Sequence, residues 1–171
     1  MSSAVIRIGV MPMGEVPDIA SKVIAAHILG YFNLRADILP PLEHPIYAYD
    51  EIRLQYNVVA ILNTLDSMSF HDYEKVIAVL NVDIFVPVFT HVFGGARQGG
   101  RYALVSLFRL GENLERVAKV ALHELGHLFN LHHCMDRRCL MHFSGGLEDL
   151  DNTPLYFRRY CSAYLREAFF R

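Results

Sequence analysis

The stretch His123-Glu124-Leu125-Gly126-His127 constrains the fold of this chain more than any other part of the sequence. Residues four apart lie one above the other on a helix, so a helix brings the imidazoles of His123 and His127 to one cation without bending the backbone. A histidine pair with this spacing is typical of zinc sites, and the adjacent carboxylate can reach a water molecule on the same ion. We therefore predict a helix that carries two zinc ligands and a general base, Glu124.

The third zinc ligand is expected from the histidines that follow this helix. His132 and His133 are neighbours, and their spacing from His127 does not by itself decide which of them binds. Three neutral imidazoles leave the fourth position of a tetrahedral zinc ion to water. We expect the zinc to lower the pKa of that water and Glu124 to accept its proton, so that a peptide carbonyl can be attacked.

Three cysteines, Cys134, Cys139 and Cys161, are candidates for a second, structural zinc site. An odd number of cysteines argues against a disulfide framework, and cysteines beside a metal motif are typical ligands in a reducing compartment. Structural zinc takes four ligands, so a histidine, either His142 or His132, would have to complete the site. The alternative is an empty or partly filled site with free thiols.

The segment around these residues resembles the metzincin zinc peptidases and, within them, the archaemetzincins. The residues in register with the family pattern are His123, Glu124, His127, His133, Cys134, Cys139 and Met141. The resemblance implies that His133, rather than His132, is the third ligand of the catalytic zinc. It also implies that Met141 forms the Met-turn, an apolar floor beneath that site.

Two positions depart from the family pattern. The signature glycine is replaced by Asn130, which after glycine tolerates the expected left-handed backbone best. The distal Cys-x-x-Cys pair keeps only Cys161, and Arg158 stands where its first cysteine is expected. A four-thiolate site therefore cannot be completed from the cysteines of this chain alone.

The resemblance further implies an α+β fold with a twisted mixed sheet, an edge strand over the substrate cleft, a backing helix and an active-site helix. Phe93, Gly94, Gly95 and Ala96 resemble that edge strand, and small residues allow a peptide backbone to pair closely with it. The alternative for these residues is a hairpin bend. The implied activity is that of a peptidase, of aminopeptidase or broader type, acting on a peptide or protein substrate. The alternative is a catalytically silent zinc-binding or peptide-binding protein of the same fold.

Length and charge limit the remaining possibilities. A chain of 171 residues suggests one domain, with an N-terminal lobe over 1–130 and a small C-terminal lobe over 131–171 that ends in a helix. The net charge of −2 gives no basis for binding nucleic acid. No apolar run reaches the roughly 18 residues that span a bilayer, and the first residues are not typical of a signal peptide. We expect a cytoplasmic monomer without a pro-segment.

Hydrophobic periodicity and turn residues predict the elements in more detail. Residues 56–62 fit either a strand or a buried helix, and the length of the run favours a helix over 50–65. We predict that 82–85 continues the sheet of the strand before it. The remaining predictions are strands at 4–11, 35–39, 76–80 and 102–108, helices at 18–32, 113–130 and 153–169, and loops at 40–50 and 142–152.

Overall fold

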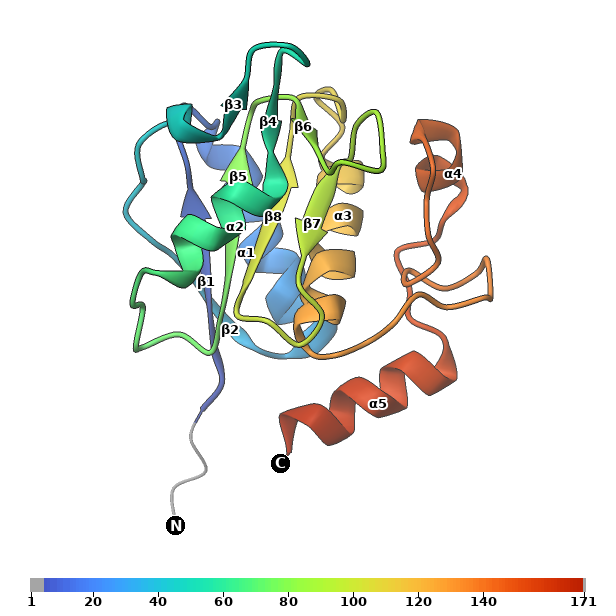
Figure 1. The fold of residues 1–171 in the computed structure, drawn as a ribbon. Helices are drawn as coiled ribbons and strands as arrows, with labels where there is room; N and C mark the ends of the chain where they lie inside the picture. The colour runs from blue at the N-terminus through green and yellow to red at the C-terminus, as the bar shows by residue number, and fades with distance from the viewer. Residues whose placement is uncertain (1–4, 171) are drawn as a thin grey trace.

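A five-stranded mixed sheet lies at the centre of the computed structural model, which describes residues 5–170 (Figure 1). Its strand order is β2-β1-β5-β8-β7, and β7 pairs antiparallel with β8 at one edge while the other neighbours pair parallel. The strands are β1 (Arg7–Pro12), β2 (Arg35–Ile38), β5 (Lys75–Leu80), β7 (Gly94–Ala96) and β8 (Tyr102–Ser106). The predicted α+β class with a mixed sheet and an edge strand is confirmed.

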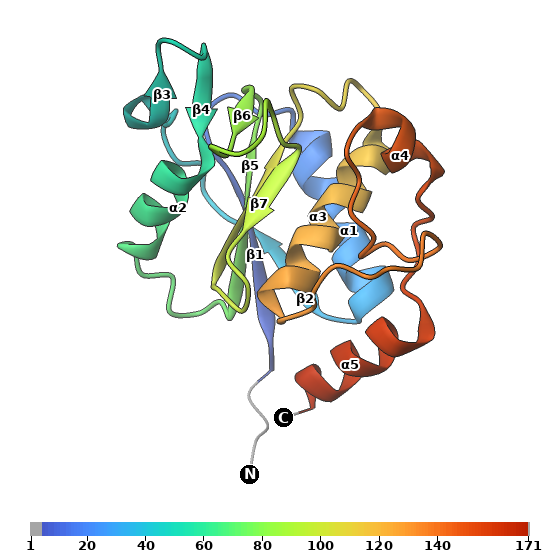
Figure 2. The ribbon, with the colours of Figure 1, turned by 45° about the vertical axis from the view of Figure 1, so that its right-hand side comes forward.

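Helices cover both faces of this sheet. Helix α2 (Val58–Asp66) lies on one face, and α1 (Asp18–Phe32) and α3 (Leu114–Leu128) lie on the other (Figure 2). Successive side chains of a strand point to opposite faces. On β5, for example, Ile77 and Val79 pack into the core beneath α1 and α3, whereas Ala78 packs into the core beneath α2. The predicted helix over 113–130 is α3, with Asn113 as its cap.

The segment between β2 and β5 corrects two predictions. The chain forms a short helix η1 (Ile46–Ala48) and strands β3 (Tyr49–Asp50) and β4 (Gln55–Asn57) before α2 begins. The predicted helix over 50–65 therefore starts late, because the Asn57 side chain accepts hydrogen bonds from the backbone N–H groups of Val59 and Ala60 and caps α2 there. The predicted loop over 40–50 contains η1 and β3.

Strand β6 (Ile84–Phe85) does not extend the main sheet, as residues 82–85 were expected to do. It pairs parallel with β4 in a separate three-stranded sheet of order β3-β4-β6. Two-residue strands carry too little periodicity to reveal their partner, so this pairing depends on contacts between distant segments. Strand β6 also contacts the segment that leads into β7, because the Val92 N–H donates to the Ile84 oxygen (3.0 Å).

The C-terminal segment also differs from expectation. Residues 142–152 contain helix α4 (Leu147–Asn152), and the last helix, α5, spans Arg159–Phe169 rather than starting at Thr153. Thr153 ends α4 with extended backbone, because Pro154 follows it and disfavours the helical conformation at the preceding residue. Leu150, Phe157, Cys161 and Leu165 are buried in the same core cluster as α1 and α3.

At the N-terminal end, β1 matches the predicted strand over 4–11, of which Ala4 lies outside the described residues. Helix α1 has the predicted bounds, with Pro17 at the cap position and Asp18 as the first helical residue. None of the helices in residues 5–170 has the length and apolar composition that crossing a membrane requires.

Candidate active site

Helix α3 fixes the positions of His123, Glu124 and His127. Asn113 starts the helix, because its side-chain oxygen accepts the backbone N–H of Arg116 (3.1 Å). A row of buried apolar residues packs the helix against the sheet and against α1, which lies beside it on the same face. These are Val117, Val120, Ala121, Leu125 and Leu128. The residues that carry the site therefore stand on a helix packed into the main core.

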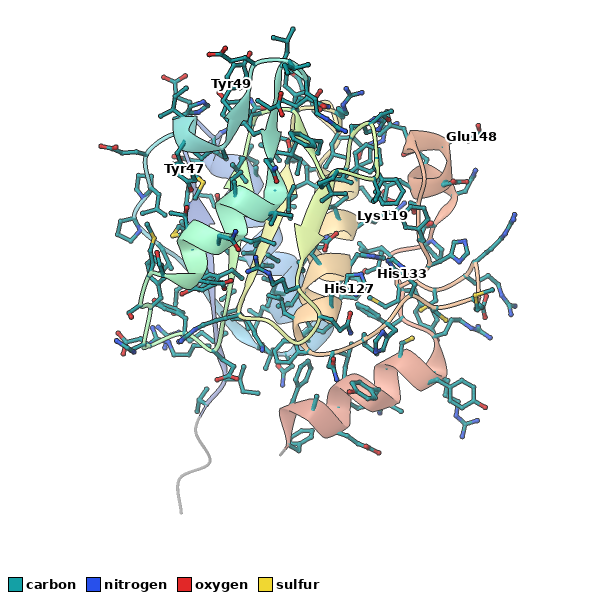
Figure 3. The ribbon with its side chains drawn as sticks, viewed as in Figure 1. Tyr47, Tyr49, Lys119, His127, His133 and Glu148 are labelled. Carbon is teal, nitrogen blue, oxygen red and sulfur yellow. The ribbon has the colours of Figure 1, made fainter. Side chains whose placement is uncertain are left out.

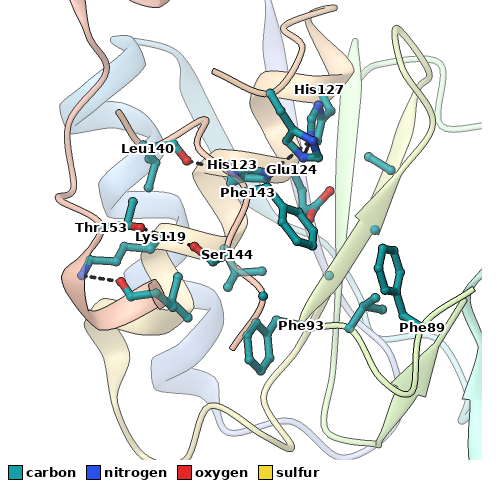
Figure 4. A pocket seen from close by; sticks show the side chains of 18 of the residues that line it. Phe89, Phe93, Lys119, His123, Glu124, His127, Leu140, Phe143, Ser144 and Thr153 are labelled. Carbon is teal, nitrogen blue, oxygen red and sulfur yellow. Dashed lines mark hydrogen bonds between the residues drawn. The ribbon is translucent and has the colours of Figure 1, made fainter. Parts of the chain in front are cut away.

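Backbone carbonyls orient the two helical imidazoles. The Nδ1 atom of His123 lies 2.7 Å from the Leu140 oxygen, and the Nδ1 atom of His127 lies 2.8 Å from the Leu131 oxygen. A carbonyl only accepts hydrogen bonds, so each Nδ1 must carry the proton and each Nε2 must present a lone pair. Figure 4 shows His123 beside Leu140 at the mouth of the cavity.

His133 is the third histidine at this point, and His132 is not part of the group. The chain turns back after α3 at Asn130, whose φ of 70° is left-handed, and the Leu131 N–H donates to the Gly126 oxygen (2.9 Å). Asparagine at this position therefore does what the signature glycine was expected to do. The interpretation that His133 binds zinc stays a prediction, supported by this placement.

The spacing of the imidazoles fits a tetrahedral zinc ion. The Nε2 atom of His127 lies 3.1 Å from that of His123 and 3.2 Å from that of His133. Two ligands about 2.05 Å from zinc at the tetrahedral angle are separated by about 3.3 Å. The Nε2 lone pairs of His123 and His127 would repel each other at this distance, and a cation between them removes that repulsion. A proton is a poor substitute, since burial and the neighbouring His127 lower the pKa of His123 to about 3.

Glu124 lies beside the histidines and lines the same cavity. Its side chain is almost fully buried, and burial raises the pKa of the carboxyl group to about 8. A buried carboxyl group whose pKa is close to neutrality suits general acid–base chemistry.

This raised pKa predicts how the stability of the metal-free protein depends on pH. Well below pH 4.5 the carboxyl group of Glu124 is neutral in both the folded and the unfolded chain, because its pKa is about 8 in the folded chain and 4.5 in the unfolded chain. As the pH rises to about 8 only the unfolded chain ionises, so the wild type should lose about 1.4 kcal/mol of stability per pH unit relative to Glu124→Gln. Urea unfolding of both metal-free proteins at several pH values measures the difference. If the free energy of unfolding depended on pH in the same way in both proteins, the raised pKa of Glu124 would be contradicted.

Met141 lies directly beneath the helix that carries the ligands. It is fully buried, and a Cβ atom added to Gly126 would stand 2.5 Å from its sulfur atom. Glycine inside a helix costs about 1 kcal/mol relative to alanine, so a specific packing contact at that position is expected. Gly126 provides it by letting Met141 approach, and the role of Met141 as an apolar floor stays a prediction.

The two glycines of β7 leave room for side chains of the helices that pack on either face of the strand. A Cβ atom on Gly94 would stand 2.7 Å from the Leu104 oxygen and 2.9 Å from both Glu124 Cγ and Val120 Cγ1. On the opposite face of the strand, a Cβ atom on Gly95 would stand 2.7 Å from Val58 of α2. Within the described residues β7 pairs only with β8, so its other edge has no strand partner. Substrate pairing at 93–96 stays a prediction.

A cavity of about 390 Å³ opens beside the histidines. Two of the rings that line it, Phe89 and Phe143, come from distant segments and are stacked with centroids 5.9 Å apart (Figure 4). Phe143 also lies against His133 (5.4 Å between centroids). Other lining residues come from β7, α3 and the C-terminal segment, and they include Phe93, Val120, Leu140, Leu150 and Thr153.

Lys119 connects α3 to the far wall of this cavity. Its buried Nζ donates to the backbone oxygens of Leu150 (3.1 Å) and Asp151 (3.3 Å) and pairs with Glu115 (3.0 Å). Figure 3 shows Lys119 between α3 and α4. All three ammonium protons of Lys119 have an acceptor, so these bonds hold the far wall in place. The ammonium group has no further proton to offer the cavity, and the side of Lys119 that faces the cavity is mainly apolar.

The three cysteines are brought together, with their sulfur atoms within 4.8 Å of one another. Neither His132 nor His142 belongs to this group, so the structure does not provide the histidine that was expected to complete it. His142 instead has its Nδ1 atom 3.0 Å from the Cys134 oxygen. The prediction of a metal at these cysteines remains untested, and its expected fourth ligand is not in place.

Sequence reasoning missed several residues of the site. Phe89, Lys119 and Phe143 line the cavity from three different segments, and no local pattern marks them. Gly126 did carry a signal, because glycine is unfavourable inside a helix and indicates a close contact.

The chain is similar in sequence and in fold to known peptidases. The sequence model of peptidase family M54 matches residues 27–167. The chain is 42% identical over 127 residues to an archaemetzincin of Methanopyrus kandleri, covering 71% of this chain and 72% of that protein. The crystal structure of archaemetzincin from the same organism superposes with a TM-score of 0.89 at 32% identity, covering 100% of this chain and 99% of the other. A zinc-dependent peptidase from Methanocorpusculum labreanum superposes with a TM-score of 0.83 at 26% identity, covering 92% and 99%.

Proposed function

The chain belongs to peptidase family M54 and is a zinc metallopeptidase, and we propose that Glu124 is the general base with which it hydrolyses peptide bonds. This proposal depends on one observation. The Nε2 atoms of His123, His127 and His133 converge at the mouth of a cavity that Glu124 also lines. The open cavity beside Glu124 favours turnover over the alternative of a silent zinc-binding or peptide-binding protein.

The three histidines would hold the zinc ion, which supplies Lewis-acid chemistry by acidifying a water molecule and polarising the scissile carbonyl. Glu124 takes up the proton of the attacking water and then passes it to the leaving amine. Burial raises the pKa of Glu124, and a neighbouring cation lowers it, so the two effects together keep the carboxyl group able to exchange protons near neutral pH. The carbonyls of Leu140 and Leu131 keep the imidazoles in the tautomer that offers Nε2.

We propose that the substrate is an extended peptide that pairs with the free edge of β7. A peptide antiparallel to β7 has its N-terminal residues beside Ala96. Just beyond this point the chain is tied to the end of α3, because the Gln98 side chain donates to the Leu131 oxygen (2.8 Å) and the Gly99 N–H donates to the His127 oxygen (2.9 Å). These two contacts close the chain against α3 just beyond Ala96, and they support aminopeptidase-like action, in which few residues precede the scissile bond.

A peptide library with free and acetylated N-termini tests this proposal. The zinc-loaded protein should cleave the free peptides near their N-termini, and acetylation should lower kcat/KM by about tenfold or more, the loss that about 1.4 kcal/mol of binding represents. A zinc chelator should abolish cleavage, and added zinc should restore it. Equal cleavage of acetylated peptides would mean endopeptidase action, and no cleavage of any peptide would contradict the proposed general-base mechanism.

We also propose a second zinc ion at Cys134, Cys139 and Cys161, supported by the close approach of their sulfur atoms. The three free cysteines support action in a reducing compartment, and we propose the cytoplasm. A monomer without membrane or nucleic-acid partners is our further proposal. Size-exclusion chromatography with light scattering tests the oligomeric state, and a dimer would contradict it.

A further inference from the structure

We infer that Cys134, Cys139 and Cys161 form an open three-thiolate metal site whose fourth ligand comes from outside the chain, as a small anionic thiol. The three sulfur atoms lie within 4.8 Å of one another, and residues 5–170 add no histidine, aspartate or glutamate to the group. Zinc with four ligands therefore retains one position that the described chain does not fill.

Arg158 occupies the place from which a fourth cysteine would reach the site. It precedes α5, three residues before Cys161, and positions three apart lie on the same side of a helix end. Its backbone N–H points at the Cys139 sulfur (3.4 Å), so the backbone of residue 158 stands directly against the thiol group. The guanidinium group pairs with Asp136 (3.0 Å).

Exposure shows where an external ligand would enter. Cys139 and Cys161 are buried, whereas Cys134 is only partly buried and the Arg158 side chain is 39% exposed. The partly exposed residues thus flank the unfilled position. Because an arginine stands where a further cysteine would supply a thiolate, the site has one sulfur ligand fewer than a four-thiolate zinc site, and an external thiolate restores that set. A small thiol would bind as its thiolate, release its proton to solvent and displace a water molecule.

Cobalt-substituted protein, kept free of oxygen, tests the inference in the wild type. Excess acetohydroxamate, which binds through oxygen, is present throughout to occupy the open position of the imidazole site, so that thiolate-to-cobalt charge-transfer absorption in the near ultraviolet reports only the cysteine site. Titration with 2-mercaptoethanol should raise this absorption by about one third, as three thiolates become four. Absence of the band, or a band that added thiol leaves unchanged, would overturn the inference.

Arg158→Cys should close the site. Without added thiol, the charge-transfer absorption of this variant should already equal that of the wild type with added thiol, and 2-mercaptoethanol should not change it. A colorimetric chelator should also remove the second zinc ion more slowly from this variant than from the wild type. Arg159→Cys is the matched control, since Arg159 is exposed at the neighbouring position, and it should behave like the wild type.

The outcome does not depend on peptide hydrolysis, because neither absorption nor zinc release requires turnover. A peptidase that lacks the band would retain the proposed function and lose this inference, and an inactive protein with the band would do the reverse. Equal responses of Arg158→Cys and the wild type would also overturn the inference. If Arg158→Cys fails to fold, the wild-type titration still decides it.

Discussion

Replacing Glu124 with glutamine is expected to lower kcat by about 10²- to 10⁴-fold, the range typical of losing a general acid–base group, while zinc binding is retained. Glutamine has almost the same shape and no titratable proton, so the packing against Gly94 and Val120 is preserved. The zinc ligands are the neighbouring histidines, which the change leaves in place. Steady-state kinetics on a peptide substrate and zinc content by mass spectrometry measure the two effects.

The matched control is Glu112→Gln, which removes the same charge from an exposed residue before α3. It should leave both kcat and zinc content unchanged. Retained turnover in Glu124→Gln would exclude this carboxylate as the base. Loss of zinc together with turnover would instead show that Glu124 supports the metal site structurally.

Replacing Gly94 with alanine is expected to give the second largest loss of activity, although this residue carries no reactive group. The new methyl group would overlap the Leu104 oxygen, which is backbone, and the side chains of Glu124 and Val120. Because the backbone cannot yield easily, Glu124 must move, and kcat should fall at least tenfold, the effect of about 1.4 kcal/mol on the barrier. Overpacking should also cost about 1–3 kcal/mol of stability. Kinetics and chemical denaturation measure both quantities.

Gly95→Ala provides the comparison on the same strand. Its methyl group would overlap Val58 of α2, on the face of the sheet away from Glu124. The loss of stability should be similar, but kcat should fall much less than in Gly94→Ala. Equal losses of kcat would show that general disturbance of β7, rather than displacement of Glu124, causes the effect.

The ligand-bearing helix could be predicted because its signal is local. Spacing within a helix fixes which side chains share a face, so His123 and His127 follow from the sequence alone. The choice between His132 and His133 does not follow, because it depends on how the chain turns at Asn130. Only the resemblance to a family favoured His133, and the structure brings that residue to the site.

The parts that were predicted wrongly are short elements decided by distant contacts. Strand β6 pairs with β4, about 28 residues earlier in the chain, and two residues carry no usable periodicity. Helix α4 lies in a stretch with glycines and acidic residues that indicated a loop. Lys119 of α3 donates hydrogen bonds to carbonyl oxygens at the C-terminal end of α4, a contact across 31 residues. Because such contacts join residues that are far apart in the sequence, local sequence patterns do not predict which residues form the walls of the cavity.

The backbone carbonyls that accept hydrogen bonds from the imidazole rings also affect how the protein takes up its zinc ion. Leu140 and Leu131 hold His123 and His127 through hydrogen bonds that involve no metal, and both leucines are anchored in the core. A chain that loses its zinc should keep these two rings aimed at the same point, so recapture requires little ordering of side chains. Uptake should then be limited by the arrival and dehydration of the ion rather than by refolding.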